Sequence, residues 1–307
     1  MNELNFACPS CRVPLTRLSA TQRRCPADHT IYECHDGIWR FLTPDRQAYF
    51  DRFMHEYQMV RQAEQRGSRD AAYYRALPFV DLSGRFTSDW RIRARSFNTL
   101  QRKVLQPLEQ AAKRPLRAID LGAGNGWLSY RLAQRGHKVA AIDLLTNSLD
   151  GLGAYVHYDA AFTPVQAEFD RLPFSENQID LIIFNASLHY STHYETTLCE
   201  ALRVLHPQGQ LIILDSPVYR SADSGLQMVR EREAAFTRAY GFPSNALASE
   251  NYLTDQRLHD LAETLHLHWK FVRPFYGWRW LWRPLTARLR RRREPARFAV
   301  IVGQRWT

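Results

Sequence analysis

The sequence predicts an α/β fold with a doubly wound, mostly parallel sheet, and three observations support this. Short apolar strands alternate with helical segments, and they fall near 116–121, 138–143, 163–168, 179–185 and 209–215. The first strand runs into alternating glycines at 122, 124 and 126, and the second ends in Asp143. Two later apolar stretches, near 268–275 and 298–304, are expected to complete a seven-stranded sheet as an antiparallel edge pair.

The amino-terminal segment, 1–43, carries a cysteine pattern that is typical of zinc sites. Cys8-Pro-Ser-Cys11 is followed by Cys25-Pro-Ala-Asp-His29. Paired thiolates on two short loops suit tetrahedral zinc, so Cys8, Cys11, Cys25 and His29 are the expected ligands. Asp28 and Cys34 remain alternatives for the fourth ligand. A further alternative is that the segment has lost its metal. A module this small would draw much of its folding energy from the metal.

Residues 44–113 are expected to form a helical connector. Asp81-Leu-Ser-Gly84 breaks it after Pro78, and Ser88 is the expected N-cap of a helix that runs on to Lys113. The side chains that could face a ligand at the sheet edge are Tyr73, Tyr74, Arg91, Arg93 and Arg95. The alternative is ordinary amphipathic packing with a solvated face.

Residues 118–126, Ala-Ile-Asp-Leu-Gly-Ala-Gly-Asn-Gly, are the most informative stretch of the chain. Such glycines let the backbone turn sharply and approach a ligand, and the next helix points free N–H groups at it. A dinucleotide fingerprint would have its third glycine three residues after the second, where Trp127 stands. Because ligands of doubly wound sheets bind outside the carboxyl ends of the strands, the loop and Asp143 are expected to lie in one site.

This loop resembles motif I of the class I S-adenosylmethionine (SAM) dependent methyltransferases, and of the methyltransferase type 11 domain in particular. Three later stretches, near 166–174, 179–189 and 201–215, resemble the following motifs of that family, so the resemblance spans roughly 118–218. It implies a Rossmann-like domain over 114–307 that uses SAM. The cofactor-binding residues that it implies are Asp120, Gly122, Ala123, Gly124, Gly126, Asp143, Leu144, Glu168, Phe169 and Asn185.

Within that resemblance, Asp143 would accept the ribose hydroxyls, Glu168 would lie near the adenine amino group, and Phe169 would pack beside the base. The catalytic candidates at the ends of the fourth and fifth expected strands are Asn185, His189, Tyr190 and Asp215, with His193 one helical step further along the chain. His189 could deprotonate a hydroxyl near neutral pH, or the segment could only wall the pocket. Asn185 is followed by Ala186 and Ser187, which differs from the nucleic-acid N-methylase motif.

The amino-terminal segment is similar to the small zinc-ribbon domains of the Trm112 type, which carry a comparable Asp-Gly-Ile hairpin at 36–38. Its ligand spacing is also similar to the zinc module of 23S rRNA guanine-N1 methyltransferases. Nothing in the ribbon suggests catalysis. The second similarity keeps an RNA substrate among the alternatives.

The positive charge of the chain is concentrated near its carboxyl end. Residues 273–307 hold ten arginines and one acid, Glu294, so this stretch contributes +9 of the formal net charge of +10. The basic, aromatic insertion 277–297 contains Trp278–Arg293, where Pro284 is expected to start a short helix with Leu285 and Leu289 on one side. Tryptophans beside arginines suit a membrane interface or RNA, and a solvated helix is the third alternative.

The chain has no apolar stretch long enough to span a bilayer and no secretory signal pattern, so we expect a cytoplasmic protein, or one that is peripheral at the membrane. Insertion 217–249 is expected to cover the acceptor pocket as a lid. The leading hypothesis is a SAM-dependent methyltransferase of a small-molecule or lipid-like acceptor. The alternatives are an rRNA or tRNA base methyltransferase and a non-catalytic zinc-ribbon scaffold. The oligomeric state is left open.

Overall fold

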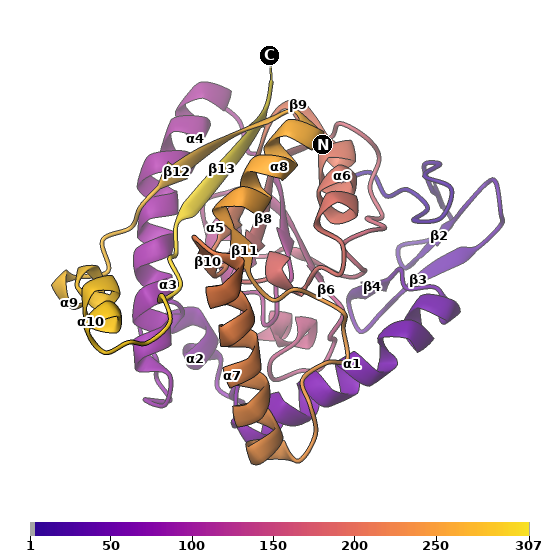
Figure 1. The fold of residues 1–307 in the computed structure, drawn as a ribbon. Coiled ribbons are helices and arrows are strands. Elements are labelled where there is room, and N and C mark those ends of the chain that lie inside the picture. Colours follow the sequence, from indigo (N-terminus) through magenta and orange to yellow (C-terminus); the bar gives the residue numbers. More distant parts are fainter. Residues whose placement is uncertain (1–3, 307) are drawn as a thin grey trace.

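The computed structural model describes residues 4–306, and its centre is one large sheet with helices on both faces (Figure 1). The strand order is β1-β2-β3-β4-β7-β6-β5-β8-β9-β13-β12. The seven expected strands form the contiguous part of this order from β7 to β12, with β13 antiparallel to both of its neighbours. This confirms the α/β prediction. The strand count of seven is wrong, because four strands of the amino-terminal segment extend the same sheet to eleven.

The strands of the large sheet are β1 (Thr16–Arg17), β2 (Gln22–Arg24), β3 (Ile31–His35), β4 (Ile38–Arg40), β5 (Arg117–Leu121), β6 (Lys138–Asp143), β7 (Thr163–Gln166), β8 (Ile179–Asn185), β9 (Leu205–Leu214), β12 (Leu267–Val272) and β13 (Val300–Arg305). Strands β5 to β9 form the centre of the sheet, and β5, β6, β8 and the second half of β9 are buried on both faces, which explains the near-continuous apolar sequences of those stretches. All five run parallel, so their carboxyl ends meet at one edge of the sheet.

The amino-terminal segment is joined to the sheet edge by parallel pairing of β4 with β7, where Trp39 lies opposite Val165. An aromatic cluster reinforces the junction. The ring of Phe6 lies 5.2 Å from that of Trp39 and 5.5 Å from that of Phe174, which precedes β8. The segment therefore shares one hydrophobic core with the α/β sheet. The boundary at residue 43 stays a prediction.

Two core layers lie on opposite faces of the sheet. One face is covered by α6 (Tyr194–Val204) and α8 (Asp255–Leu265), whose leucines join the inward residues Ile119 and Phe184. The other is covered by α2 (Ala71–Ala76), α3 (Thr87–Leu100) and α5 (Trp127–Gln134). The alternation of Ile182 and Ile183 between the two cores follows from the two-residue period of a strand.

The connector is helical, as predicted. It consists of α1 (Pro44–Ala63), α2, α3, a π-helical turn at Gln101–Leu105 and α4 (Gln106–Ala112). The prediction that Ser88 caps the long helix is wrong, because the helix starts one residue earlier, at Thr87. Asp81, in the preceding turn, is the side chain that binds the start of the helix: its carboxylate accepts hydrogen bonds from the backbone N–H of Phe86 and from the hydroxyl of Thr87.

The remaining elements lie around the carboxyl ends of the strands. They are the short 3-10 helices Leu152–His157 and Leu188–Tyr190, the strand pair β10 (Val218–Tyr219) and β11 (Leu253–Thr254), and the helices α7 (Ala222–Tyr240), α9 (Trp278–Leu281) and α10 (Arg283–Leu289). The short helix predicted at Pro284 in insertion 277–297 is confirmed as α10, and insertion 217–249 contains α7. Among the described residues, no helix combines the length and apolar character needed to cross a membrane.

Candidate active site

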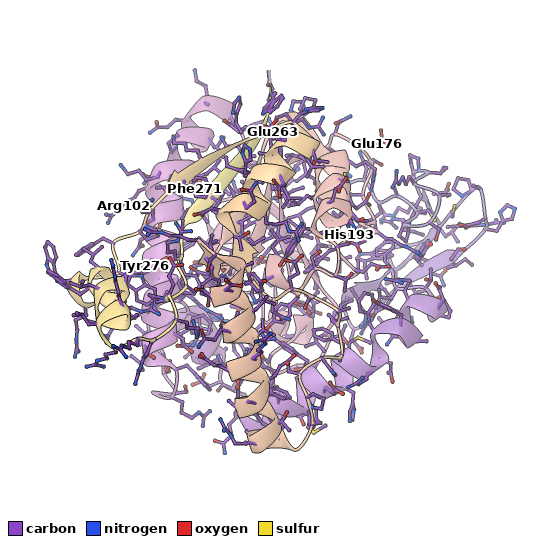
Figure 2. All side chains as sticks on the ribbon, viewed as in Figure 1. Arg102, Glu176, His193, Glu263, Phe271 and Tyr276 are labelled. Carbon is purple, nitrogen blue, oxygen red and sulfur yellow. The ribbon has the colours of Figure 1, made fainter. Side chains whose placement is uncertain are left out.

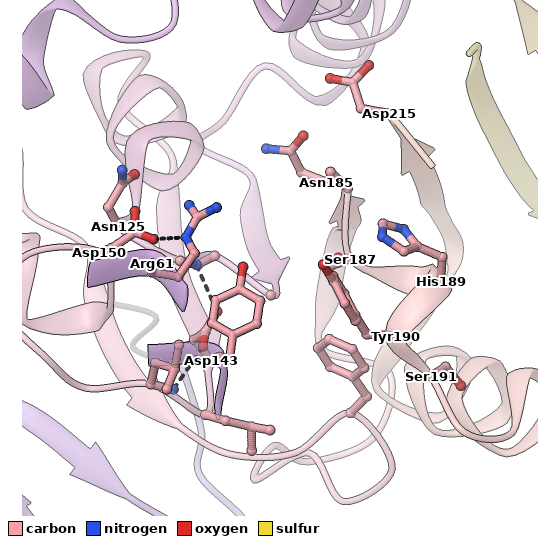
Figure 3. Close-up of a pocket in the computed structure, with 18 of the residues that line it drawn as sticks. Arg61, Asn125, Asp143, Asp150, Asn185, Ser187, His189, Tyr190, Ser191 and Asp215 are labelled. Carbon is pink, nitrogen blue, oxygen red and sulfur yellow. Dashed lines mark hydrogen bonds and ion pairs between the residues drawn. The ribbon is translucent and has the colours of Figure 1, made fainter. Parts of the chain in front are cut away.

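A cavity of about 400 Å³ lies at the edge where the carboxyl ends of β5, β6, β8 and β9 meet, and α1 and α3 form its other wall. It is the place where doubly wound sheets bind their ligands. Its polar and charged lining residues include Arg61, Arg66, Tyr73, Arg93, Asn125, Asp143, Asp150, Glu168, Asp170, Asn185, Ser187, His189, Tyr190, Ser191, Thr192, Thr197 and Asp215. Figure 3 shows many of these side chains around the open space.

The glycine loop forms the floor of this cavity. Gly122 has φ +74°, and a Cβ atom there would lie 2.3 Å from Cβ of Ser187, so only glycine fits. The backbone N–H of Gly124 donates to Oδ2 of Asp143 over 2.8 Å, and that of Leu145 donates to Oδ1 over 2.9 Å. Burial raises the pKa of Asp143, while these backbone hydrogen bonds oppose the shift. The loop and Asp143 therefore lie together, as predicted.

Asp120 lies beneath the loop and is not among the lining residues. Its Oδ2 atom accepts a hydrogen bond of 2.8 Å from the hydroxyl of Ser129 in α5, and Oδ1 has no partner among the described residues. Burial raises the pKa of Asp120 to about 7. Gly126 also lies away from the cavity, and a Cβ there would meet the ring of Phe162. Both residues could act on a ligand only through the shape of the loop.

Glu168 and Phe169 line the cavity beyond β7. Arg46 of α1 donates to both oxygens of Glu168, over 2.8 and 2.6 Å. The ring of Phe169 meets Phe184 edge to face, with 5.6 Å between the ring centroids. Leu144 lies next to Asp143 on the opposite side. The adenine side of the predicted site is thus a carboxylate beside an aromatic ring, closed by a helix of the connector.

Helix α1 supplies lining residues that our reading of the sequence missed. Phe50, Phe53 and Tyr57 face the cavity, and Arg61 forms an ion pair with Asp150. The rings of Phe53 and Tyr57 each lie 6.2 Å from that of Tyr190. The spacing of the three aromatic residues is that of one helical face, which is the signal that could have found them. However, no pattern in the neighbouring sequence indicates that these aromatic residues lie near the glycine loop.

Three polar atoms that have no hydrogen-bond partner among residues 4–306 lie at the end of the cavity formed by β8 and β9. They are Oδ1 of Asn185, Nδ1 of His189 and Oδ2 of Asp215. Figure 3 shows Asn185 and Asp215 at the ends of neighbouring strands, with His189 beside them. Ala186 and Asp215 both have φ +53°, a left-handed conformation that is strained for residues other than glycine and is common at functional sites.

Burial shifts the pKa values of two of these groups in opposite directions. It raises the pKa of Asp215 to about 6, although hydrogen bonding from Ser96 and the nearby charge of Arg93 oppose the shift. It lowers the pKa of His189 to about 3, with help from the charges of Arg232 and Arg93. His189 is therefore neutral and a weak base here, which works against the predicted proton transfer.

The other sequence candidates are placed as follows. Tyr190 lines the cavity and lies against His189, with 4.5 Å between ring centroids. His193 caps α6 instead, accepting from the backbone of Thr196. Of the candidates in the connector, Arg93 and Tyr73 line the cavity. Tyr74 instead donates hydrogen bonds to backbone oxygens of Ser68 and Leu149, and Arg95 donates to the backbone oxygen of Tyr276. Arg91 is exposed.

The predicted zinc ligands are brought together only in part. Ligand atoms of Cys8, Cys11, Cys25 and Asp28 all lie within 4.8 Å of one another. His29 lies outside this group, with its Nδ1 atom 3.0 Å from the guanidinium of Arg24. His29 has φ +63°, so the backbone turns its side chain away, while Asp28 points back toward Cys8 at 3.4 Å. Of the alternatives for the fourth zinc ligand, Asp28 rather than His29 is therefore the residue that lies beside the three cysteines.

The segment with α9 and α10 projects from one end of the molecule (Figure 1), and Tyr276 lies where it leaves the body (Figure 2). Its apolar side chains are largely exposed: Phe275, Trp278, Leu281, Trp282, Leu285 and Leu289. Trp278 is 72% and Leu289 is 75% exposed, so neither is held in a core. We call this group the apolar face of α9–α10. Arginines at 279, 283, 288 and 290–293 surround it.

Comparison with known proteins agrees with this geometry. Residues 119–213 match the family described as methyltransferase domain. An uncharacterized methyltransferase of Mycobacterium bovis is 33% identical over 115 residues, which cover 38% of this chain and 44% of that protein. A malonyl-acyl-carrier-protein O-methyltransferase of Erwinia pyrifoliae is 32% identical over 124 residues, with 39% and 46% covered. The chain thus spans less than half the length of these relatives.

Among solved structures, the 1,6-didemethyltoxoflavin N1-methyltransferase of Burkholderia thailandensis, with 1,6-didemethyltoxoflavin and S-adenosylhomocysteine bound, has a TM-score of 0.45. It is 17% identical, and 95% of this chain and 99% of that chain are covered. The family match carries the assignment, because it contains the glycine loop, Asp143, Glu168 and Asn185. Residues 119–213 of this chain are therefore a methyltransferase domain.

Proposed function

We propose that the protein is a SAM-dependent methyltransferase that acts on a small-molecule or lipid-like acceptor. The observation that carries the proposal is the glycine loop on the cavity floor, where the N–H of Gly124 is fixed on Asp143. A Cβ at Gly122 would close the space beside Ser187, so the loop leaves room for a ligand only if position 122 is glycine. This cradle fits the methionine and ribose parts of SAM, and Phe169 beside Glu168 fits its adenine.

SAM supplies an activated methyl group on its sulfonium when it is bound. The residues of the chain then have to orient the acceptor and exclude water. The aromatic side chains of Phe50, Phe53 and Tyr57 cover the cavity from the α1 side, and Trp90 and Arg93 cover it from α3. The site is deep enough that several of its polar groups are almost fully buried.

The test is calorimetric titration of S-adenosylhomocysteine into the full chain. We expect a dissociation constant in the micromolar range for the protein. The variant Gly122→Ala should abolish the heat of binding by filling the cradle, and Gly136→Ala is its control. If the unaltered protein does not bind S-adenosylhomocysteine, the methyltransferase proposal fails and the scaffold alternative takes its place.

The acceptor class is tested with tritiated SAM and three pools: a bacterial lipid extract in mixed micelles, a bacterial small-molecule extract, and total rRNA. The curated relative from Erwinia pyrifoliae acts on a malonyl group on a carrier protein, as its name states. We expect label in the lipid or small-molecule pool. Label in rRNA alone would favour the RNA alternative.

We also propose that the apolar face of α9–α10 contacts an anionic membrane surface. Leucines at 281, 285 and 289 accompany the tryptophans. Aliphatic side chains add acyl-chain burial at a bilayer but cannot stack on bases, so the composition favours lipid over RNA. The surrounding arginines fit an anionic headgroup layer.

Vesicle flotation tests this contact. The protein should float with phosphatidylglycerol vesicles at low salt and stay behind with phosphatidylcholine vesicles. Trp278→Ser combined with Trp282→Ser should abolish flotation, while Trp306→Ser, at a distant partly exposed tryptophan, should not. Equal flotation of both variants would contradict the proposal. If the protein does not float but binds rRNA in a salt-dependent way, RNA rather than a membrane is the partner of this face.

We propose, finally, that Cys8, Cys11, Cys25 and Asp28 hold a structural zinc ion. Three sulfur ligands and one oxygen suit tetrahedral zinc. The Sγ atoms of Cys11 and Cys25 lie 3.4 Å apart, close to the edge of a zinc tetrahedron with bonds of about 2.3 Å. Cys8 and Cys25 are buried, so the site ties the two loops of the amino-terminal segment to the aromatic cluster.

A further inference from the structure

No residue that the structure describes pairs with the polar atoms Oδ1 of Asn185, Nδ1 of His189 and Oδ2 of Asp215. Each is buried, and a buried polar atom without a hydrogen bond costs about 1–3 kcal/mol. All three residues line the cavity and lie at or just after the ends of β8 and β9, whereas Glu168, on the proposed adenine side, follows β7, which β6 and β5 separate from β8. A ligand at this end would satisfy them. This is where the acceptor would lie if the proposed function is right.

Asp215 is the only carboxylate among the three, and its two oxygens have different surroundings. Oδ1 accepts a hydrogen bond from the hydroxyl of Ser96 in α3. The hydroxyl of Tyr276 lies 2.7 Å from that of Ser96 and can donate to it, because Ser96 uses its own proton on Asp215. These two hydrogen bonds orient the carboxylate and leave Oδ2 without a partner in the described part of the protein. A carboxylate held by one oxygen and free at the other has the geometry of a proton acceptor.

We propose that Asp215 is the general base of the reaction and that the acceptor is a molecule whose nucleophilic oxygen or nitrogen still carries a proton. The proposal rests on the proposed methyltransferase function. As a lone pair of the acceptor atom forms the bond to the methyl group, the bond between that carbon and the sulfonium sulfur of SAM would break with its electron pair left on sulfur, giving S-adenosylhomocysteine. The O–H or N–H bond of the acceptor breaks as well, and its proton passes to Oδ2 of Asp215. The electron pair of that bond stays on the acceptor atom, and the carboxyl group returns the proton to water when the product leaves.

The surroundings of Asp215 support this role. Its pKa, raised to about 6, leaves it ionised at neutral pH and still a usable base, whereas the pKa of about 3 makes neutral His189 a poor one. The charged and titratable groups that interact with Asp215 are Arg93 on α3 and Tyr276 after β12, and His189 is influenced by Arg93 and by Arg232 on α7. Asn185 and His189 are then positioning residues, whose free atoms can hydrogen-bond to the acceptor.

The role predicts a specific pH profile. With Asp215 as base, kcat/KM should rise about tenfold per pH unit below pH 6 and level off above it. Removing the hydroxyl of Ser96 removes an interaction that lowers the pKa of Asp215. Ser96→Ala should therefore move the inflection of kcat/KM to higher pH, a shift that a purely structural role of Ser96 would not produce.

The main experiment compares Asp215→Asn with Asp260→Asn, an exposed carboxylate on α8. Titration with S-adenosylhomocysteine should give affinities within a few fold of each other for both variants and the unaltered protein. Transfer of tritiated methyl to the pool labelled by the unaltered protein should fall by at least about a hundredfold in Asp215→Asn only. A variant that keeps both binding and transfer would overturn the base assignment.

Two further readouts keep the outcomes distinct. In protein labelled with carbon-13 at the aspartate carboxyls, the resonance missing from Asp215→Asn should titrate near pH 6, and a midpoint below pH 4 would overturn the proposal. If the unaltered protein itself does not bind S-adenosylhomocysteine, the proposed function has failed. If it binds and transfers methyl but Asp215→Asn does so too, only the base assignment has failed.

Discussion

Arg46 of α1 and Glu168 beyond β7 form a two-pronged ion pair, with N–O distances of 2.8 and 2.6 Å. The carboxylate side chain is 4% exposed and the guanidinium side chain is 22% exposed, so the pair lies mostly in the protein interior. Through it, the connector is fastened to the methyltransferase domain at the predicted adenine side of the cavity. Arg171 contributes a weaker contact to Glu168, at 3.7 Å.

Arg46→Met should destabilise the fold and weaken cofactor binding. Removing one partner of a buried pair leaves the other charge uncompensated, at a cost of about 3 kcal/mol. Urea unfolding and titration with S-adenosylhomocysteine measure the two effects. Arg52→Met, in the same helix but at an exposed i,i+4 pair with Glu56, is the control and should cost less than about 1 kcal/mol. Equal losses in the two variants would contradict this account.

Gly122→Ala and Gly136→Ala separate backbone strain from ligand space. Both glycines have positive φ, +74° and +84°, so both variants incur strain of about 1–3 kcal/mol. A Cβ at Gly122 meets Ser187, whereas one at Gly136 meets nothing within 4 Å. We therefore expect loss of S-adenosylhomocysteine binding in Gly122→Ala only. Unchanged affinity in Gly122→Ala would mean that the loop does not hold the cofactor.

Asp28→Ala should lower the zinc affinity of the protein, and His29→Ala should not. Asp28 lies within the cysteine group, whereas His29 faces Arg24. We expect at least about a tenfold loss for Asp28→Ala, measured by competition with a chromophoric chelator. Cys11→Ser is the positive control. A loss confined to His29→Ala would restore the ligand set expected from the spacing C-x3-H.

Asp120 predicts a pH dependence of stability. Its pKa is about 7 in the folded chain and near 3.8 when unfolded, so between these values the folded state binds more protons. The free energy of unfolding should therefore fall as pH rises from 4 to 7, by at most about 1.4 kcal/mol per pH unit, and stay level above. Asp120→Asn lacks this contribution, so urea unfolding at pH 5 to 8 should show a flatter slope. Parallel slopes would refute the assignment.

The sequence alone predicted the features that depend on neighbours along the chain. Alternating glycines after an apolar strand specify a tight turn at Gly122 and Gly124, and a strand ending in Asp143 places a carboxylate at the sheet edge. The carboxyl ends of parallel strands lie at the same edge of a sheet whatever the order of the strands within it. The convergence of Asp143, Glu168 and Asn185 therefore followed from strand periodicity and strand direction. The seven strands from β7 to β12 and the helical character of the connector were predicted for the same reason, because they follow local periodicity.

Contacts across long stretches of chain were decided only by the tertiary structure. Local periodicity says nothing about which distant segments meet, so the pairing of β4 with β7 and the ion pair of Arg46 with Glu168 could not be predicted. The choice of Asp28 over His29 depends on one backbone turn, which the ligand spacing does not record. The hydrogen-bond chain from Tyr276 through Ser96 to Asp215 joins three distant elements, and only their packing reveals which oxygen remains free.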